Sequence, residues 1–131
     1  MKIGRMRRAV PRDYKSIASW YTARGQEAPP EYPPVCVIMP QVASGGLIPT
    51  QGSICLIEGL ITNPRASKQV RSDGLDKIIK HLTEYAKNMG FSYIVGLTKV
   101  PHVVSLSEKH GFSKIGDYTM VSKHLSTKES A

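Results

Sequence analysis

The chain has 131 residues, of which 40% are hydrophobic and 21% charged, and its formal net charge is +8. This length suits one domain with a real core, and the composition excludes a disordered chain. No apolar run approaches the roughly 18–20 residues that a membrane-spanning helix needs, so we expect no membrane partner. The basic amino terminus is not followed by an apolar stretch, so we expect no signal peptide and a cytoplasmic location.

The excess of positive charge leaves two interpretations open. Part of it lies near the amino terminus, at Lys2, Arg5, Arg7, Arg8 and Arg12. Such a cluster fits either an anionic partner, nucleic acid or a phosphorylated cofactor, or a solvated basic face. No aromatic residues alternate with these cations, so a stacking platform for single strands is not favoured.

The two cysteines lie within apolar, strand-like runs. We interpret Cys36 and Cys55 as buried thiols rather than as a disulfide or a metal pair, because a reduced buried cysteine behaves as a small hydrophobe. The spacing of cysteine and histidine matches no zinc site, and we expect no metal.

The first third of the chain predicts a weak strand over residues 2–10 and a helix from Pro11 to about Arg24. The apolar stripe of this helix is predicted at Tyr14, Ile17, Ala18 and Tyr21. Residues 26–34 hold four of the nine prolines and form a loop, which is either the cover of a pocket or a plain connector.

The middle of the chain predicts three short strands, over residues 35–39, 42–49 and 53–62, joined by hairpin turns and therefore antiparallel. A polar loop around Arg71 and Gly74 follows, and then an amphipathic helix over residues 75–89. The strand predicted at 93–97 returns through a right-handed crossover, so it lies parallel to the strand at 53–62.

The last part of the chain predicts a short helix over 103–110 and a hairpin of strands at 114–116 and 118–123. Residues 126–131 are polar and are expected to form a flexible tail. Among these elements, the free amides of a helix N-terminus beside Arg71 suit the phosphates of a nucleotide-type cofactor.

Two sequence blocks carry a resemblance to a known family. The first is ICLIEGLITNP, from Ile54 to Pro64, followed by RSDG and a long helix, and the second is LSEKHGF, from Leu106 to Phe112. With these blocks the chain resembles the GNAT N-acetyltransferase superfamily, and it is most similar to small phage- or prophage-type members. The resemblance covers almost the whole chain and is strongest over residues 35–112.

The resemblance implies the fold and the chemistry. The expected fold is mixed α/β (α+β), GNAT-like, with a mostly antiparallel sheet of six to seven strands, a central parallel pair and three to four flanking helices. Residues 1–125 form its single domain. The implied activity is transfer of an acetyl group from acetyl-CoA to a primary amine, on a small molecule or a protein, by direct attack. Coenzyme A is the only cofactor implied, and a homodimer is left open.

The resemblance also assigns roles to residues. Backbone groups of Leu60, Ile61 and Thr62 contact the pantetheine arm at a bulge, where amides polarise the thioester carbonyl. Glu58 acts, directly or through water, as the general base, and Ser107 occupies the position of the usual tyrosine acid. The residues expected to bind the pyrophosphate lie between the strand and the helix: Lys68, Arg71, Ser72, Asp73 and Gly74.

Two departures from the family pattern keep rival functions open. Asp76 stands where the phosphate loop normally ends in a small residue, and Ser107 stands where tyrosine is usual. One rival is a GNAT-like domain without transfer activity that acts as a binding or virion-associated protein. Another is a phage enzyme that modifies nucleic acid on the same scaffold, which the basic charge suits and which would act in the host cytoplasm.

Overall fold

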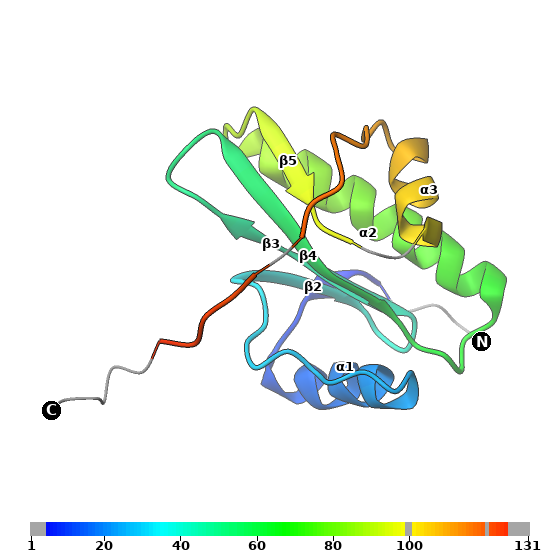
Figure 1. Ribbon diagram of the computed structural model, residues 1–131. Helices are drawn as coiled ribbons and strands as arrows, with labels where there is room; N and C mark the ends of the chain where they lie inside the picture. The colour runs from blue at the N-terminus through cyan, green and yellow to red at the C-terminus, as the bar shows by residue number, and fades with distance from the viewer. Residues whose placement is uncertain (1–4, 99–100, 120, 126–131) are drawn as a thin grey trace, which may run out of the picture.

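The structure is a computed structural model that describes residues 5–98, 101–119 and 121–125. Its elements, in chain order, are β1 (Arg7–Arg8), α1 (Pro11–Ala23), β2 (Val35–Met39), β3 (Ala43–Pro49), β4 (Ile54–Thr62), α2 (Lys68–Asn88), β5 (Tyr93–Gly96) and α3 (Pro101–Lys109) (Figure 1). The five strands form one sheet in the order β1-β2-β3-β4-β5.

Strand directions follow the prediction. β1, β2, β3 and β4 pair antiparallel with their neighbours, and β4 pairs parallel with β5. The parallel pair requires a crossover, and α2 supplies it. The mixed sheet with one parallel pair is therefore confirmed. Its described size is five strands, smaller than the predicted six to seven.

The sheet has a helix on each face (Figure 1). Side chains alternate along β2, so that Val35, Val37 and Met39 join the cluster under α2. Cys36 and Ile38 point to the opposite face and join the cluster under α1. Both cysteines are buried free thiols, and burial raises the pKa of each.

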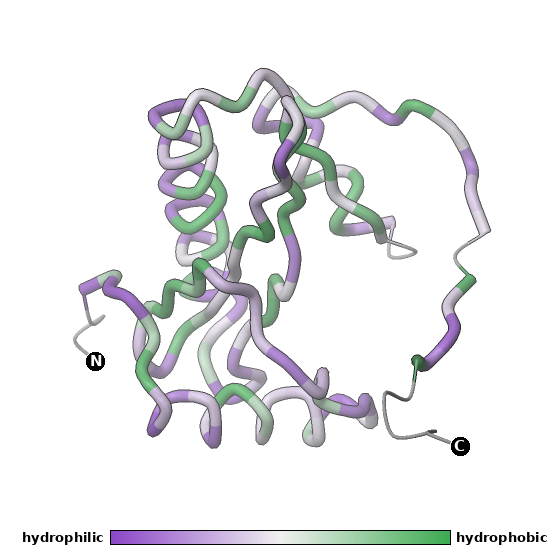
Figure 2. The backbone as a smooth tube through the Cα atoms, turned by 90° about the vertical axis from the view of Figure 1, so that its left-hand side faces the viewer, coloured by the Kyte–Doolittle hydropathy of each residue, from purple (hydrophilic) through white to green (hydrophobic). Residues whose placement is uncertain are grey.

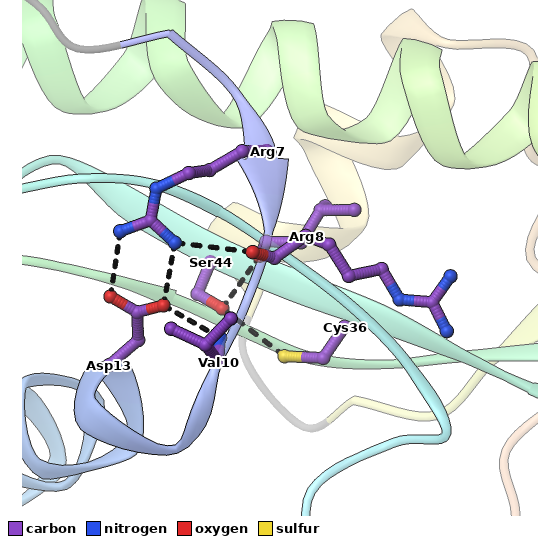
Figure 3. A network of polar contacts seen from close by, with 7 residues as sticks. Arg7, Arg8, Val10, Asp13, Cys36 and Ser44 are labelled. Carbon is purple, nitrogen blue, oxygen red and sulfur yellow. Dashed lines mark hydrogen bonds and ion pairs between the residues drawn. The ribbon is translucent and has the colours of Figure 1, made fainter.

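Helix α1 is held to β1 by a buried carboxylate, shown in Figure 3. Asp13 accepts two hydrogen bonds from the Arg7 guanidinium, at 2.7 and 2.9 Å, and a third from the backbone amide of Val10 at 2.7 Å. The buried residues of α1 are Asp13, Ile17 and Trp20. Of the predicted stripe, Ile17 is buried and Tyr14, Ala18 and Tyr21 are half-buried, while Trp20, which the predicted stripe leaves out, is also buried.

Helix α2 begins at Lys68, seven residues before the predicted start at 75. Ser67 is the N-cap, and its hydroxyl accepts from the Val70 amide at 3.2 Å. The segment 68–74, predicted as a loop, is thus helical. Packing explains the difference, since Gly74 is buried against the sheet and keeps this part of the helix close to it.

The C-terminal part departs most from expectation. Helix α3 spans Pro101–Lys109 rather than 103–110, and the predicted strands at 114–116 and 118–123 are wrong for the described residues, which form no strand there. Ile115 and Val121 are exposed there, so burial of these apolar side chains does not stabilise a strand among the described residues. The predicted tail, 126–131, and part of the predicted first strand, 2–4, lie outside the described residues. Within the described ranges, no helix is long and apolar enough to cross a bilayer.

Candidate functional site

The site is organised by a bulge in β4. Glu58 pairs with Gly46 and Ile61 pairs with Ser44, so an advance of three residues along β4 matches an advance of two along β3. The extra residue falls at Gly59–Leu60, and Gly59 has φ +69°. A glycine in this left-handed conformation is typical of a bulge that bends its strand and frees backbone groups from the ladder.

Just before the bulge, β4 leaves the ladder with its parallel neighbour. The register between β4 and β5 runs from Ile54–Tyr93 to Ile57–Gly96 and ends there, whereas β4 continues to Thr62. On the β5 side, the main chain of Leu60 and Ile61 is therefore outside the parallel ladder. These backbone groups are the ones that the resemblance assigns to the pantetheine arm.

Glu58 lies at the start of the bulge on the α1 face of the sheet. Its neighbour Ile57 belongs to the cluster on the α2 face, and side chains alternate along a strand. The Glu58 side chain is exposed. Burial is the largest cause that raises the pKa of Tyr21, and Tyr32, Cys36 and the negative charge of Glu58 add to it. The Glu58 carboxylate and the Tyr21 phenol therefore lie on the same face of the sheet.

The proline-rich loop covers the bulge. A Cβ atom on Gly46 would lie 2.6 Å from Pro33 Cβ, and one on Gly59 would lie 3.6 Å from Pro33 Cγ. The neighbouring Tyr32 is stacked on Tyr14 of α1, with ring centroids 4.3 Å apart, and its hydroxyl donates to the Tyr14 carbonyl at 3.2 Å. The loop therefore lies against the bulge, while neither of the two grooves described for this chain is lined by residues 26–34.

The N-terminus of α2 follows β4 after five residues. Its first amides have no acceptor within the helix, and the first turn carries no acidic residue. Arg71 bends back from the helix and donates to the carbonyls of Pro64 and Ala66, at 3.2 and 3.1 Å. Its guanidinium therefore braces the loop before the helix, and Lys68 stands exposed on the first turn.

The remaining residues predicted for phosphate binding lie in the first two turns of α2. Ser72 is half-buried, and the exposed Asp73 accepts from Gln69 Nε2 at 3.0 Å. Gly74 is buried on the sheet side, where a Cβ atom would lie 2.5 Å from Val42 Cγ1. The structure thus gives Gly74 a packing role, which the sequence did not predict.

Asp76 faces α3. Its carboxylate contacts His110 Nε2 at 2.9 Å and Lys109 Nζ at 3.3 Å. The hydrogen bond from His110, and then Lys109, lowers the pKa of Asp76. This carboxylate is therefore ionised, and it is paired with Lys109 at the end of α3 and hydrogen-bonded to His110 just beyond it.

Ser107 is the second predicted catalytic residue, and its hydroxyl is already engaged. Ser107 Oγ donates to the Val103 carbonyl at 2.8 Å, one turn earlier in α3. The hydroxyl proton is thus directed into the helix backbone.

The sequence did not predict a groove beside α1 or the contact that Arg24 makes next to it. A groove of about 410 Å³ lies between α1, the β2–β3 turn and the loop after β4. Its lining residues are Ser16, Ser19, Trp20, Ala23, Gln41, Asn63, Pro64 and Arg65. Nearby, Arg24 donates to Thr62 Oγ1 at 2.6 Å and ties the end of α1 to the end of β4. A long cation at a helix end was the available signal for Arg24, whereas the groove joins three distant segments and has no local signal.

Comparisons with known proteins concern the fold. No protein-family model matches the sequence, and no curated protein matches it as a relative. An acetyltransferase from Trypanosoma brucei is 18% identical, with a TM-score of 0.71, over 93% of this chain and 100% of that chain. A GNAT-family acetyltransferase from Streptococcus pneumoniae is 14% identical, with a TM-score of 0.58, over 98% of both chains.

A Mycobacterium tuberculosis protein solved in complex with CoA is similar to this chain at 16% identity and a TM-score of 0.63, over 90% of this chain and 76% of that chain. These likenesses span the sheet, the crossover and the helices just described. This protein therefore has the fold of the GNAT acetyltransferases.

Proposed function

We propose that this protein transfers the acetyl group of acetyl-CoA to a primary amine. The observation that carries the proposal is the bulged β4, which leaves its parallel partner after Ile57 and leads into a helix N-terminus without acidic residues. One continuous stretch of chain can therefore bind both the thioester, at the bulge, and the pyrophosphate, at the N-terminus of the helix.

The cofactor is bound in this proposal by residues along that stretch. Backbone groups of Leu60, Ile61 and Thr62 hold the pantetheine arm. The first amides of α2, with Lys68 and Arg71, hold the pyrophosphate, and Ser72, Asp73 and Gly74 complete the second turn behind it. Because Asp76 is paired with α3, its charge does not stand free against the phosphates.

The reaction needs no covalent enzyme intermediate. Glu58 takes a proton from the incoming ammonium, and the free amine attacks the thioester carbonyl carbon. The carbon–sulfur bond breaks as the amide forms, and the thiolate of CoA leaves. The second proton of the attacking amine is released as the amide forms. Because the Ser107 proton is donated to Val103, we propose that water carries this second amine proton to the thiolate.

The acceptor reaches the thioester from the α1 face. Glu58 is on that face, and Pro33, Tyr32 and Tyr21 surround the bulge there. A basic amine next to a carboxylate and phenol rings is held by charge attraction and cation–π contact. The acceptor can be a small molecule or a protein side chain.

The first experiment measures thermal unfolding with CoA and with acetyl-CoA. A ligand at 100 times its dissociation constant stabilises a fold by about 2.7 kcal/mol, so a clear rise in melting temperature is expected. No rise with either ligand would contradict the cofactor assignment.

The second experiment measures consumption of acetyl-CoA with a panel of primary amines. Glu58→Gln should remove turnover and keep the CoA-dependent rise in melting temperature. Glu84→Gln, an exposed glutamate of α2, is the matched control and should keep both the turnover and the CoA-dependent rise. Turnover that survives Glu58→Gln excludes Glu58 as the base.

The engaged hydroxyl of Ser107 favours a second candidate, a GNAT-like domain that binds CoA without transferring its acetyl group. This candidate predicts the rise in melting temperature but no acetyl-CoA consumption with any amine. The third candidate, modification of nucleic acid, requires duplex binding that falls steeply with salt.

A further inference from the structure

The groove beside α1 is the larger of the two described for this chain, and the proposed acetyl transfer does not use it. Its volume of about 410 Å³ is in the range of small-molecule sites. The last turns of α1, the β2–β3 turn and the loop after β4 meet there, at one end of the sheet (Figure 1). Helix α1 lies below the sheet and α2 above it in both Figure 1 and Figure 2, so the groove is on the face opposite α2. Among its described lining residues, none is assigned to the cofactor or to proton transfer.

The indole of Trp20 lines the groove and has an unused hydrogen-bond donor. Trp20 is only 5% exposed, and its indole nitrogen makes no hydrogen bond to any described residue. Over residues 5–98, 101–119 and 121–125, no fully buried side-chain nitrogen or oxygen lacks a partner, so this nitrogen is within reach of solvent. The groove is the opening that Trp20 lines, so the N–H faces it. A tryptophan buried to this extent normally donates its N–H to an acceptor.

Arg65 supplies the positive charge of the groove. It is exposed on the loop after β4, and within the described part of the chain its guanidinium has no hydrogen bond or ion pair. The loop beneath it is held in place, because the Arg65 amide donates to Asn63 Oδ1 at 3.0 Å and Asn63 Nδ2 donates to the Gln41 carbonyl at 2.9 Å. No aspartate or glutamate is among the described lining residues. The guanidinium is therefore available to an anionic ligand.

Further donors and an apolar wall complete the groove. The Ser16 hydroxyl has no partner among the described residues, whereas Ser19 Oγ donates to the Ser16 carbonyl at 2.6 Å. Gln41 is exposed on the β2–β3 turn, and in the described ranges it is the one residue other than glycine with a positive φ, +68°. Such a conformation costs backbone energy, and it is concentrated at functional sites. Ala23 and Pro64 supply apolar contact.

We propose that this groove binds a small organic oxyanion, a carboxylate or a phosphate ester with an apolar body. The Arg65 guanidinium and the Trp20 N–H donate to the oxyanion, and Ser16 and Gln41 add hydrogen bonds. The apolar side chains of the lining contact the body of the ligand. A cationic ligand would meet Arg65 with no carboxylate in the lining to balance it, so the charge selects an anion. This proposal does not depend on acetyl transfer.

The first test uses the indole of Trp20 as its signal. Trp20 is the only tryptophan of the sequence, so its indole N–H gives one resonance in a proton–nitrogen NMR spectrum. The probes are benzoate and phenyl phosphate, with benzyl alcohol as the uncharged control, all at constant ionic strength. We expect at least one anion to shift this resonance saturably, and the one that does identifies the oxyanion as carboxylate or phosphate. No shift with either anion, or an equal shift with benzyl alcohol, overturns the proposal.

The second test assigns the bound anion to the groove. Arg65→Gln should raise the dissociation constant of the probe about tenfold or more, because it removes the charge from the lining. Ser16→Ala should raise it by a smaller factor, about threefold, and it is a second variant if Arg65→Gln does not fold.

Two control variants remove one positive charge elsewhere. Lys80→Gln, on the exposed side of α2, and Lys68→Gln, at the N-terminus of α2, should each change the dissociation constant by less than about twofold. If Lys80→Gln weakens binding as much as Arg65→Gln, net charge alone attracts the probe and the proposal is overturned. An equal effect of Lys68→Gln also overturns it, because the oxyanion then lies at the start of α2.

Discussion

At the scale of single residues, Gly74 was predicted to bind phosphate, whereas the structure gives it a role in packing. Glycine to alanine inside a helix normally stabilises it by about 1 kcal/mol. Here the added Cβ atom would lie 2.5 Å from Val42 Cγ1, so the clash outweighs the helix preference. We expect Gly74→Ala to lower the free energy of unfolding by about 1–3 kcal/mol, measured by urea denaturation.

Two further variants identify the cause at Gly74. Val42→Ala removes the methyl group in the way, so the double variant should be more stable than the sum of the single changes predicts. Ser72→Ala, in the same turn of α2, is the control and should change stability by less than about 0.5 kcal/mol. If Val42→Ala restores nothing, steric contact is not the reason for this glycine.

Asp13 gives the fold an acid-sensitive contact. The hydrogen bond from Arg7 is the largest cause that lowers the pKa of Asp13, from 3.8 to about 2. Because the folded state holds the carboxylate deprotonated, its contribution is complete well above pH 4 and is lost as pH falls toward 2. The shift corresponds to at most about 2.5 kcal/mol.

We therefore expect Asp13→Asn to be less stable than the wild type at pH 6, with the difference shrinking between pH 5 and pH 2.5. Urea unfolding at each pH measures it. Asp117→Asn, at an exposed ion pair, is the control and should follow the wild type. A difference that is constant with pH would show that the ion pair does not set the pKa.

At the scale of elements, the apolar periodicity predicted most helices and strands, because burial of one face leaves a repeat in the sequence. The predicted start of α2 was too late in the chain because Gly74 was interpreted as a loop residue. The structure shows a stripe of Val70, Gly74 and Ile78, at intervals of four, with Ser67 as the cap. The glycine belongs to that stripe because a larger side chain would not fit against Val42.

Asp76 joins α2 to the end of α3 through Lys109 and to His110, the next residue. His110 is the largest cause that lowers the pKa of Asp76, ahead of Lys109. We expect His110→Ala to raise the pKa of the Asp76 carboxyl more than Lys109→Ala does. Carbon-detected NMR titration of that carboxyl measures both. A larger effect of Lys109→Ala would show that the contact from Lys109, at 3.3 Å, lowers the pKa of Asp76 more than the contact from His110 does.

At the scale of the whole molecule, the sequence predicted the antiparallel strands, the crossover and the parallel pair, since each depends on short-range turns and one long helix. It did not predict the groove at Trp20 or the bond from Arg24 to Thr62, which depend on how α1 packs across the sheet. The roles of Glu58 and of the pyrophosphate residues came from resemblance, and they stay predictions.

Because both helices pack on the same sheet, we expect the two faces of the sheet to unfold together. Leu82 on α2 is fully buried in the cluster on one face, and Trp20 on α1 is buried in the cluster on the other. Because β2 contributes side chains to both clusters, loss of one face should unfold the other. Leu82→Ala should cost about 2–5 kcal/mol and shift the transition seen by Trp20 fluorescence as far as that seen by far-UV circular dichroism.

Lys80→Ala, exposed on the same helix, is the control and should shift neither signal by more than about 0.5 kcal/mol. If Leu82→Ala moves the circular dichroism transition and leaves the Trp20 transition in place, the two faces unfold separately. The α1 layer would then be a unit that opens while α2 and its strands remain folded, and the cover over the β4 bulge would open with it.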